Sequence, residues 1–223
     1  MAGVVQAADP AGRNYERYVE EELFAPLGMA SSSIGVPADR HSELGQAGLL
    51  AQIYVAPLAG ERSWRPIHGE DDPEQVKYAC PAGNGRGPAR DLAAFYSALL
   101  PPAGRILREE TARLLARPAR EGVYDELQGT DTAWSLGFAL RSILSGRHAS
   151  PQAFGHGGSQ SSWAFADPEH RLAAACLCNG KPGPDKHYHR VGAVSTALYE
   201  DLGLVADSAT GRTFKLPMGM GTF

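Results

Sequence analysis

The sequence predicts an α/β fold of the α+β type, in which helices pack against an antiparallel sheet. Two apolar runs, Ser161–Ala166 and Arg171–Asn179, flank the turn sequence Asp-Pro-Glu-His, a pattern typical of two strands joined as a hairpin. Apolar residues then recur at helical spacing over Tyr188–Leu202. A hairpin followed by an amphipathic helix favours a sheet that is covered by helices.

Further elements are expected before this hairpin. The helices expected from apolar residues at helical spacing are Asn14–Leu27, the segment from Pro88 to the Pro101-Pro102 pair, and Glu109–Arg117. Strands are expected at Trp134–Leu140 and, twice, within Asp39–Ser63. So few strands would leave long sheet edges unpaired, which native folds avoid. The sequence therefore predicts that partner strands are missing.

The composition is that of a soluble globular protein. The 223 residues, 43% hydrophobic and 21% charged, suit one large domain or two small ones and exclude a fully disordered chain. A net charge of -4 and the lack of a Lys/Arg run argue against a nucleic-acid partner. No run reaches the ~18 apolar residues of a membrane helix. Met1–Pro10 also lacks the features of a signal peptide, so we expect no membrane segment and favour a cytoplasmic location.

The cysteines predict neither a disulfide framework nor a metal site. They are three in number, so Cys80, Cys176 and Cys178 are expected to be small buried hydrophobes. Zinc bound by the last two together with His187 and His189 is the alternative. A Cys-x-Cys strand cannot easily share one tetrahedral ion with histidines of the next helix, so no metal is expected.

The strongest local pattern is the run Phe-Gly-His-Gly-Gly-Ser at 154–159, directly before the hairpin. Two adjacent glycines after a histidine, at the entry to a strand, allow the backbone to approach a ligand closely. Backbone N–H groups there could stabilise an oxyanion. The alternative is a flexible turn that carries a surface histidine.

Four runs together resemble the serine β-lactamase and penicillin-binding protein family, most closely its class C β-lactamase and carboxylesterase branch. "FGHGGSQSSWAFADPEHRLAAACLCN" resembles the third motif of that family and the hairpin after it. "NYERYVEEELFAPLGMASSSIG" is similar to the helix and turn after the second motif, "PAGNGRGPARDLAAFYSALL" to the glycine-rich loop and its helix, and "AWSLGFAL" to the strand before the third motif. The matches follow the family order from Asn14 to Leu202.

The resemblance implies roles for six residues. His156 takes the place of the third-motif cation, Gly157 that of the Thr or Ser, and Gly158 that of the motif's glycine. Ser159 would supply an oxyanion-hole backbone N–H, which makes His156 and Ser159 the implied catalytic residues. His-Gly-Gly is more similar to the esterase branch than to typical β-lactamases, which carry Thr at the middle position.

Gly83 and Asn84, in the glycine-rich loop, would belong to the pocket wall and contact substrate. The same loop lacks the Lys-Ser/Thr ending of a phosphate-binding loop, and no cofactor is expected.

The other two motifs of the family are absent from this sequence. The four lysines are preceded, three positions earlier, by Glu74, Cys178, Gly183 and Arg212, so no Ser-x-x-Lys occurs, and no Tyr-x-Asn occurs either. In the family, that serine is the nucleophile and that lysine activates it.

We therefore expect a β-lactamase/transpeptidase-like domain at residues 1–205, without its N-terminal helix and strands, and a polar tail at 206–223. The expected function is the C-terminal part of a serine hydrolase that cleaves a small ester or amide in the full-length parent and is inactive alone. The alternative is a non-catalytic remnant that binds or assembles.

Overall fold

The computed structural model describes residues 1–57, 63–67, 72–102, 105–126, 130–159, 161–205 and 214. The chain forms two compact units. The first unit comprises Met1–Phe95 with Asn179–Lys181, and the second comprises Tyr96–Cys178 with Pro182–Phe223. The tail predicted at 206–223 lies outside the described residues except for Phe214, which is buried and packs against Ile143.

Helices dominate the first unit. They are α1 (Ala2–Ala8), α2 (Tyr15–Val19), the π-helical segment η1 (Glu20–Phe24), α3 (Ala25–Leu27), α4 (Ala38–Gln46), α5 (Pro73–Val76) and most of α6 (Ala89–Ala98). The continuous helical run from α2 to α3 confirms the prediction at Asn14–Leu27. The Asn14 side chain caps its start by accepting a hydrogen bond from the Arg17 N–H, and Gly28 ends it in the left-handed conformation, at φ +70°.

Short strands complete the first unit. β1 (Ser33–Ile34) pairs with β4 (Gly85–Arg86), and a three-stranded sheet has the order β12 (Gly180–Lys181), β2 (Tyr54–Val55) and β3 (Arg65–Pro66). Of the two strands predicted within Asp39–Ser63, β2 is present and α4 occupies the start of the segment, whereas residues 58–62 lie outside the described residues. The first turn of α4 carries Asp39, whose charge suits the positive end of the helix dipole.

The second unit is built on a five-stranded antiparallel sheet. Its order is β11 (Leu172–Leu177), β10 (Ser162–Asp167), β9 (Phe154–Gly158), β8 (Ala139–Leu140) and β7 (Ala133–Trp134). The β10–β11 hairpin confirms the two predicted strands, with Trp163 opposite Cys176 and Asp167 opposite Leu172. β5 (Tyr124–Asp125) and β6 (Thr130–Asp131) form a separate pair, and α7 spans Glu109–Leu115, where a helix was predicted.

The single strand predicted at Trp134–Leu140 is wrong. The chain reverses there, and its two halves pair with each other as β7 and β8. The Ser135 N–H donates to the Phe138 carbonyl at 2.9 Å and closes the turn, in which Gly137 has a φ of +113°. That backbone angle favours glycine, so Gly137 makes the reversal possible rather than weakening a continuous strand.

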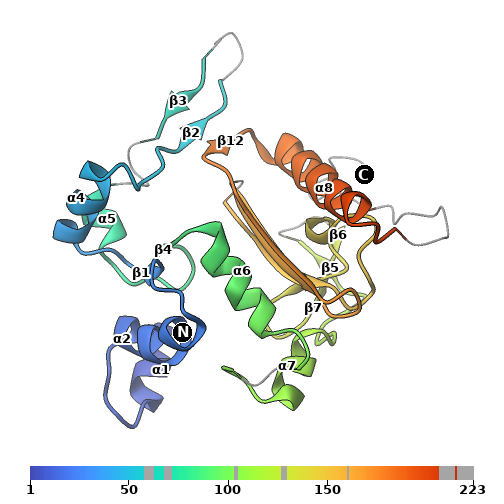
Figure 1. Cartoon of the computed structure of the whole chain (residues 1–223), viewed down its shortest axis with the longest axis horizontal. Coiled ribbons are helices and arrows are strands. Elements are labelled where there is room, and N and C mark those ends of the chain that lie inside the picture. Colours follow the sequence, from blue (N-terminus) through green and yellow to red (C-terminus); the bar gives the residue numbers. More distant parts are fainter. Residues whose placement is uncertain are drawn as a thin grey trace. The chain divides into compact units, whose positions relative to one another are not determined.

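Helix α8 (Pro184–Asp201) covers one face of this sheet (Figure 1). Proline at its first position explains why it begins before the predicted Tyr188. Val191 and Tyr199 share a buried cluster with Trp163 and Phe165 of β10. The Trp163 indole N–H donates to Ser195 Oγ at 3.1 Å, and the Ser195 hydroxyl donates to a carbonyl of the 3-10 turn η3 (Ile143–Ser145) at 2.8 Å.

A buried carboxylate ties the hairpin to α8. Asp167 accepts hydrogen bonds from the backbone N–H and hydroxyl of Ser150, from the Tyr199 hydroxyl at 2.7 Å and from His170 Nδ1 at 2.9 Å. Burial alone would raise the pKa of Asp167, but these donors together hold it below its usual value. The buried charge is therefore well compensated.

The cysteines differ from expectation at one position. Cys80 is exposed, whereas Cys176 and Cys178 are half-buried and pack against the cluster beneath α8. In the described ranges, no helix is both long enough and apolar enough to cross a membrane.

Candidate functional site

Strand β9 carries the predicted motif and has two unlike halves. Phe154 and Gly155 are buried and pair with β10 on one side and β8 on the other. From His156 to Gly158, β9 still pairs with β10, but the described residues place no strand on its other side. His156 and Gly158 are exposed. The motif therefore lies where the strand leaves the middle of the sheet and becomes an edge.

Gly155 and Gly157 of β9 differ in the room that the structure leaves for a side chain. A Cβ at Gly155 would lie 2.4 Å from the Ala164 carbonyl oxygen and 2.7 Å from the Phe165 Cβ, which no side chain could tolerate without backbone movement. A Cβ at Gly157 would meet only ordinary contacts, at 3.5 Å from Leu144 Cδ2. Gly155 is thus required by close strand packing, whereas the bare backbone at Gly157 is not.

The imidazole of His156 has a defined orientation. Its Nδ1 lies 2.7 Å from the carbonyl oxygen of Gly157, which can only accept, so Nδ1 carries the proton. In the neutral ring, Nε2 is then the acceptor. The ring packs beside Trp134, with 5.8 Å between ring centroids. The arrangement leaves His156 able to accept a hydrogen bond or a proton at Nε2.

Tyr96, near the end of α6, contacts the backbone of His156. The phenol oxygen of Tyr96 accepts a hydrogen bond from the His156 N–H, and burial raises the pKa of this tyrosine strongly. The Tyr96 ring also packs edge-on against Phe138, at 5.7 Å between centroids, and contacts Phe154. This aromatic cluster fixes the backbone at the point where β9 becomes an edge.

A cavity of about 540 Å³ opens beside this edge. Such a volume is in the range of small-molecule sites. Its lining comes from the second unit alone: Glu121, Gly122, Asp131, Thr132, Ala133, Trp134, Ala139, Leu140, Arg141, Ser142, Ile143, Leu144, His156, Gly157, His187, Tyr188 and Phe214. The lining is mixed, with eight aliphatic or aromatic residues, seven polar or charged residues and two glycines.

His187 was considered from the sequence only as a possible zinc ligand, and it borders this cavity. It is buried, and burial together with the nearby Arg190 charge lowers its pKa to about 4. Arg190 Nη2 lies 3.0 Å from His187 Nδ1 and can only donate, so the proton of this neutral ring is on Nε2. The cavity therefore has two histidines of opposite tautomers, His156 with a free acceptor and His187 with an Nε2–H donor.

Arg141 gives the cavity a charged border that the sequence did not indicate. Its guanidinium pairs with Glu121 at 2.6 Å, and both side chains are partly exposed. The backbone of Arg141 has a φ of +50°, unusual for a residue with a side chain. The pair neutralises the two charges at this side of the cavity.

The predicted site residues are only partly brought together. His156 and Gly157 line the cavity, whereas Gly158 and Ser159 are not among its lining residues, and Ser159 is an exposed turn residue after β9. Gly83 and Asn84 belong to the first unit. There the Asn84 amide donates to the carbonyls of Gln75 and Tyr78, at 2.9 Å each, and stabilises its own loop. The roles of Gly158, Ser159, Gly83 and Asn84 in catalysis or binding remain predictions.

The described side chains offer no cluster of three or more His, Cys, Asp or Glu that could hold a metal ion. Cys176 is close enough to Cys178 for a thiol hydrogen bond, and burial raises the pKa of Cys176 to about 11. The Cys176 thiol is therefore protonated near neutral pH, unlike the thiolates that bind zinc.

Comparison with protein-family models decides the family. The model described as Beta-lactamase matches residues 1–198. The chain belongs to the β-lactamase family. A comparison with curated proteins gives no match.

Several solved structures have a similar fold. The chain is similar to simvastatin synthase (LovD) from Aspergillus terreus, with a TM-score of 0.71 and 17% identity over 90% of this chain and 53% of that one. EstCE1, described as a hydrolase with promiscuous acyltransferase activity, gives a TM-score of 0.60 and 18% identity, with 87% and 50% covered. A penicillin-binding protein homologue from Caulobacter crescentus gives 0.59 and 20%, with 85% and 53% covered.

These matches confirm the predicted mixed α/β fold with its antiparallel sheet. The chain spans about half the length of these solved structures.

Proposed function

We propose that this chain supplies the third-motif side of an acyl-serine hydrolase site, with small esters as substrates. The observation that carries the proposal is the edge of β9, where His156 and Gly157 line a cavity of about 540 Å³ that has both apolar and polar walls. The nucleophilic serine and its lysine would come from a segment that these 223 residues do not contain. The chain by itself would then bind acyl groups but not turn them over.

The proposed reaction has two balanced steps. The serine oxygen forms a bond to the ester carbonyl carbon, and the alcohol leaves with the proton that the serine loses. Water then adds to the acyl-serine, and the acid and the free serine are released. In this chain, His156 Nε2 is available to hold a proton or accept a hydrogen bond, and Ser159 is the proposed backbone donor to the developing oxyanion.

The preference for esters over β-lactams rests on Gly157. Typical β-lactamases of the family have a hydroxyl-bearing residue there, which binds the substrate carboxylate, and Gly157 has no hydroxyl to offer. The proposal is supported by the similarity to EstCE1, which is described as a hydrolase with promiscuous acyltransferase activity, and the chain is also similar to simvastatin synthase. Both are similar in fold only.

The second candidate function is a non-catalytic module that binds or assembles. It is favoured by one observation, the absence of Ser-x-x-Lys and Tyr-x-Asn from the sequence. Covalent labelling separates the two functions. We expect the chain as given to remain unlabelled by a fluorophosphonate, whereas a longer form that includes Ser-x-x-Lys is labelled and hydrolyses a nitrophenyl ester faster than a chromogenic cephalosporin.

Variants of that longer form test the site itself. Gly158→Val places a side chain 2.3 Å from Ser162 Oγ at the proposed oxyanion edge and should lower kcat by about 10²–10³, the usual effect of a lost oxyanion donor. His156→Ala should lower kcat/KM more modestly, because the lysine remains the main base. Labelling of a serine in the chain as given, or full activity with Val at 158, would contradict the proposal.

A further inference from the structure

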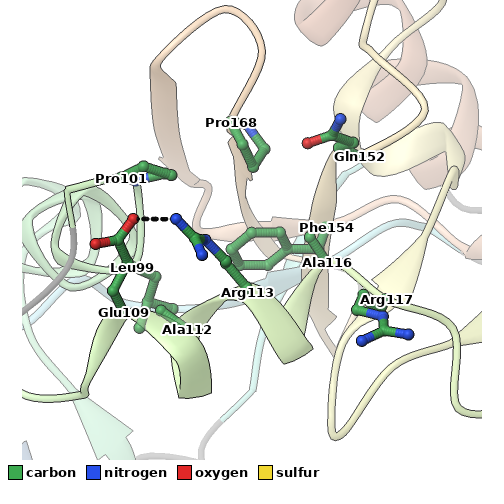
Figure 2. A pocket seen from close by; sticks show the side chains of 10 residues that line it. All are labelled: Leu99, Pro101, Glu109, Ala112, Arg113, Ala116, Arg117, Gln152, Phe154 and Pro168. Atoms are coloured by element: carbon green, nitrogen blue, oxygen red, sulfur yellow. Dashed lines mark hydrogen bonds and ion pairs between the residues drawn. The ribbon is translucent and has the colours of Figure 1, made fainter.

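A second cavity of the second unit lies away from the His156 edge, at the end of the sheet where the hairpin turns. It has a volume of about 430 Å³ and is formed by α7, the start of β9 and the β10–β11 turn (Figure 2). It is lined by Leu99, Pro101, Glu109, Ala112, Arg113, Ala116, Arg117, Gln152, Phe154 and Pro168. Of these residues only Phe154 belongs to the motif strand, and none lines the first cavity.

The floor of this cavity is apolar and firmly held. Phe154, Leu99 and Ala112 are all buried, with 1%, 3% and 5% of their surface exposed. The Phe154 ring also packs against Tyr96 and Phe138 of the aromatic cluster, so its position does not depend on a ligand. A preformed apolar floor of this kind favours the burial of an aliphatic or aromatic group.

The rim carries an uncompensated positive charge. Glu109 Oε1 pairs with Arg113 Nη2 at 2.6 Å, one turn apart on α7, and these two charges neutralise each other. Arg117 is exposed, and in the described part of the chain its guanidinium has no ion-pair or hydrogen-bond partner. In Figure 2 the Glu109–Arg113 pair lies on one side of the Phe154 ring, and Arg117 and Gln152 lie on the other. Two arginines and one glutamate leave the lining with a net charge of +1.

The geometry points to a binding site for an amphipathic monoanion, a carboxylate that carries an aliphatic or aromatic body. The body would lie on the Phe154 floor, and the carboxylate would meet the Arg117 guanidinium. A neutral apolar molecule or a polypeptide segment could cover the same floor, but neither would supply the negative charge that Arg117 lacks. This cavity shares no lining residue with the proposed ester site, so the inference does not depend on the proposed function.

The test is a calorimetric titration of the chain with decanoate and, in parallel, with methyl decanoate. We expect saturable binding of one decanoate, weakened by added salt, and weaker binding of the uncharged ester. Arg117→Gln should reduce decanoate affinity about tenfold, the effect of losing one charged hydrogen bond at an exposed rim. It should leave the affinity for the ester unchanged. Arg108→Gln, an exposed arginine near the start of the same helix and outside the cavity, is the matched control and should change neither affinity.

A second variant tests the cavity rather than the charge. Ala116→Trp should fill the space and abolish binding of both ligands, and Gln152→Trp, at an exposed position, does the same if the first variant does not fold. Thermal unfolding shows which variants are folded. Equal affinity for decanoate and its ester, an Arg117→Gln variant that binds as the parent does, or multiple weak sites that persist in the Trp variants would each overturn the inference.

Discussion

The two halves of β9 differ in burial, in strand pairing and in the room that the structure leaves for a side chain. Phe154 and Gly155 are buried and paired on both sides, and the close approach of β10 leaves no room for a side chain at Gly155. His156 and Gly157 follow directly, yet they line a cavity, and among the described residues no strand pairs with their second side. One strand thus supplies both a buried support and the border of a cavity, and the change occurs between two neighbouring residues.

The largest expected effect on stability comes from replacing one glycine by alanine in each half of β9. Gly155→Ala should lower the free energy of unfolding by about 3 kcal/mol or more, because its Cβ would lie 2.4 Å from a backbone oxygen. Gly157→Ala should change it by less than about 0.5 kcal/mol, because the nearest atom would be 3.5 Å away.

Denaturant unfolding of the two variants measures this difference directly. If both variants lose similar stability, the two halves are equally constrained and the contrast along β9 is lost.

The two histidines that line the first cavity also differ from each other, and one of them, His187, should make the free energy of unfolding depend on pH. His187 has a pKa of about 4 in the folded protein and near 6.5 when free. As the pH falls from 6.5 to 4, the unfolded chain binds a proton that the folded chain does not, so the free energy of unfolding should fall, on the order of 2 kcal/mol in total.

His187→Gln removes this contribution and should flatten the pH dependence over that window. His189→Gln, an exposed position on the same helix, is the control and should leave the slope unchanged. The measurement is the unfolding free energy at several pH values. Asp167 also weakens the fold on acidification but is present in all three proteins, so it cancels in the comparison. Equal slopes in His187→Gln and the parent would show that His187 is not buried in its neutral form.

The elements that sequence predicted well are those specified by local pattern. The β10–β11 hairpin has two apolar runs around a turn with Asp and Pro, and α8 has apolar residues at helical spacing; both signals lie within the segments themselves. The run around His156 stands out in the sequence because its glycines are adjacent, but only His156 and Gly157 of the predicted site line the cavity, and the role of the motif stays a prediction.

The failures and omissions depend on contacts between distant residues. The composition of Trp134–Leu140 is that of one strand. The chain reverses within it, with Gly137 at a positive φ that composition does not reveal, and the two halves pair with each other. The neutral state of His187 arises from its burial at the start of α8, and no sequence pattern marks it beyond an arginine three positions later. The second cavity is lined by residues of α7, β9 and the hairpin turn, which are distant in the chain, so no local sequence pattern indicates that they meet.

The smallest expected effect on stability is that of His156→Ala. The side chain is exposed, and its Nδ1 hydrogen-bonds the carbonyl of the next residue, so its loss should change the unfolding free energy by less than about 0.5 kcal/mol. This small value matters because the sequence left open whether His156 is merely a surface histidine on a turn. If stability is unchanged, any loss of ester hydrolysis in the longer form reflects the site rather than folding. A loss above about 1.5 kcal/mol would instead mean that His156 supports the strand through its contact with Trp134, and that the border of the cavity is as structural as Gly155.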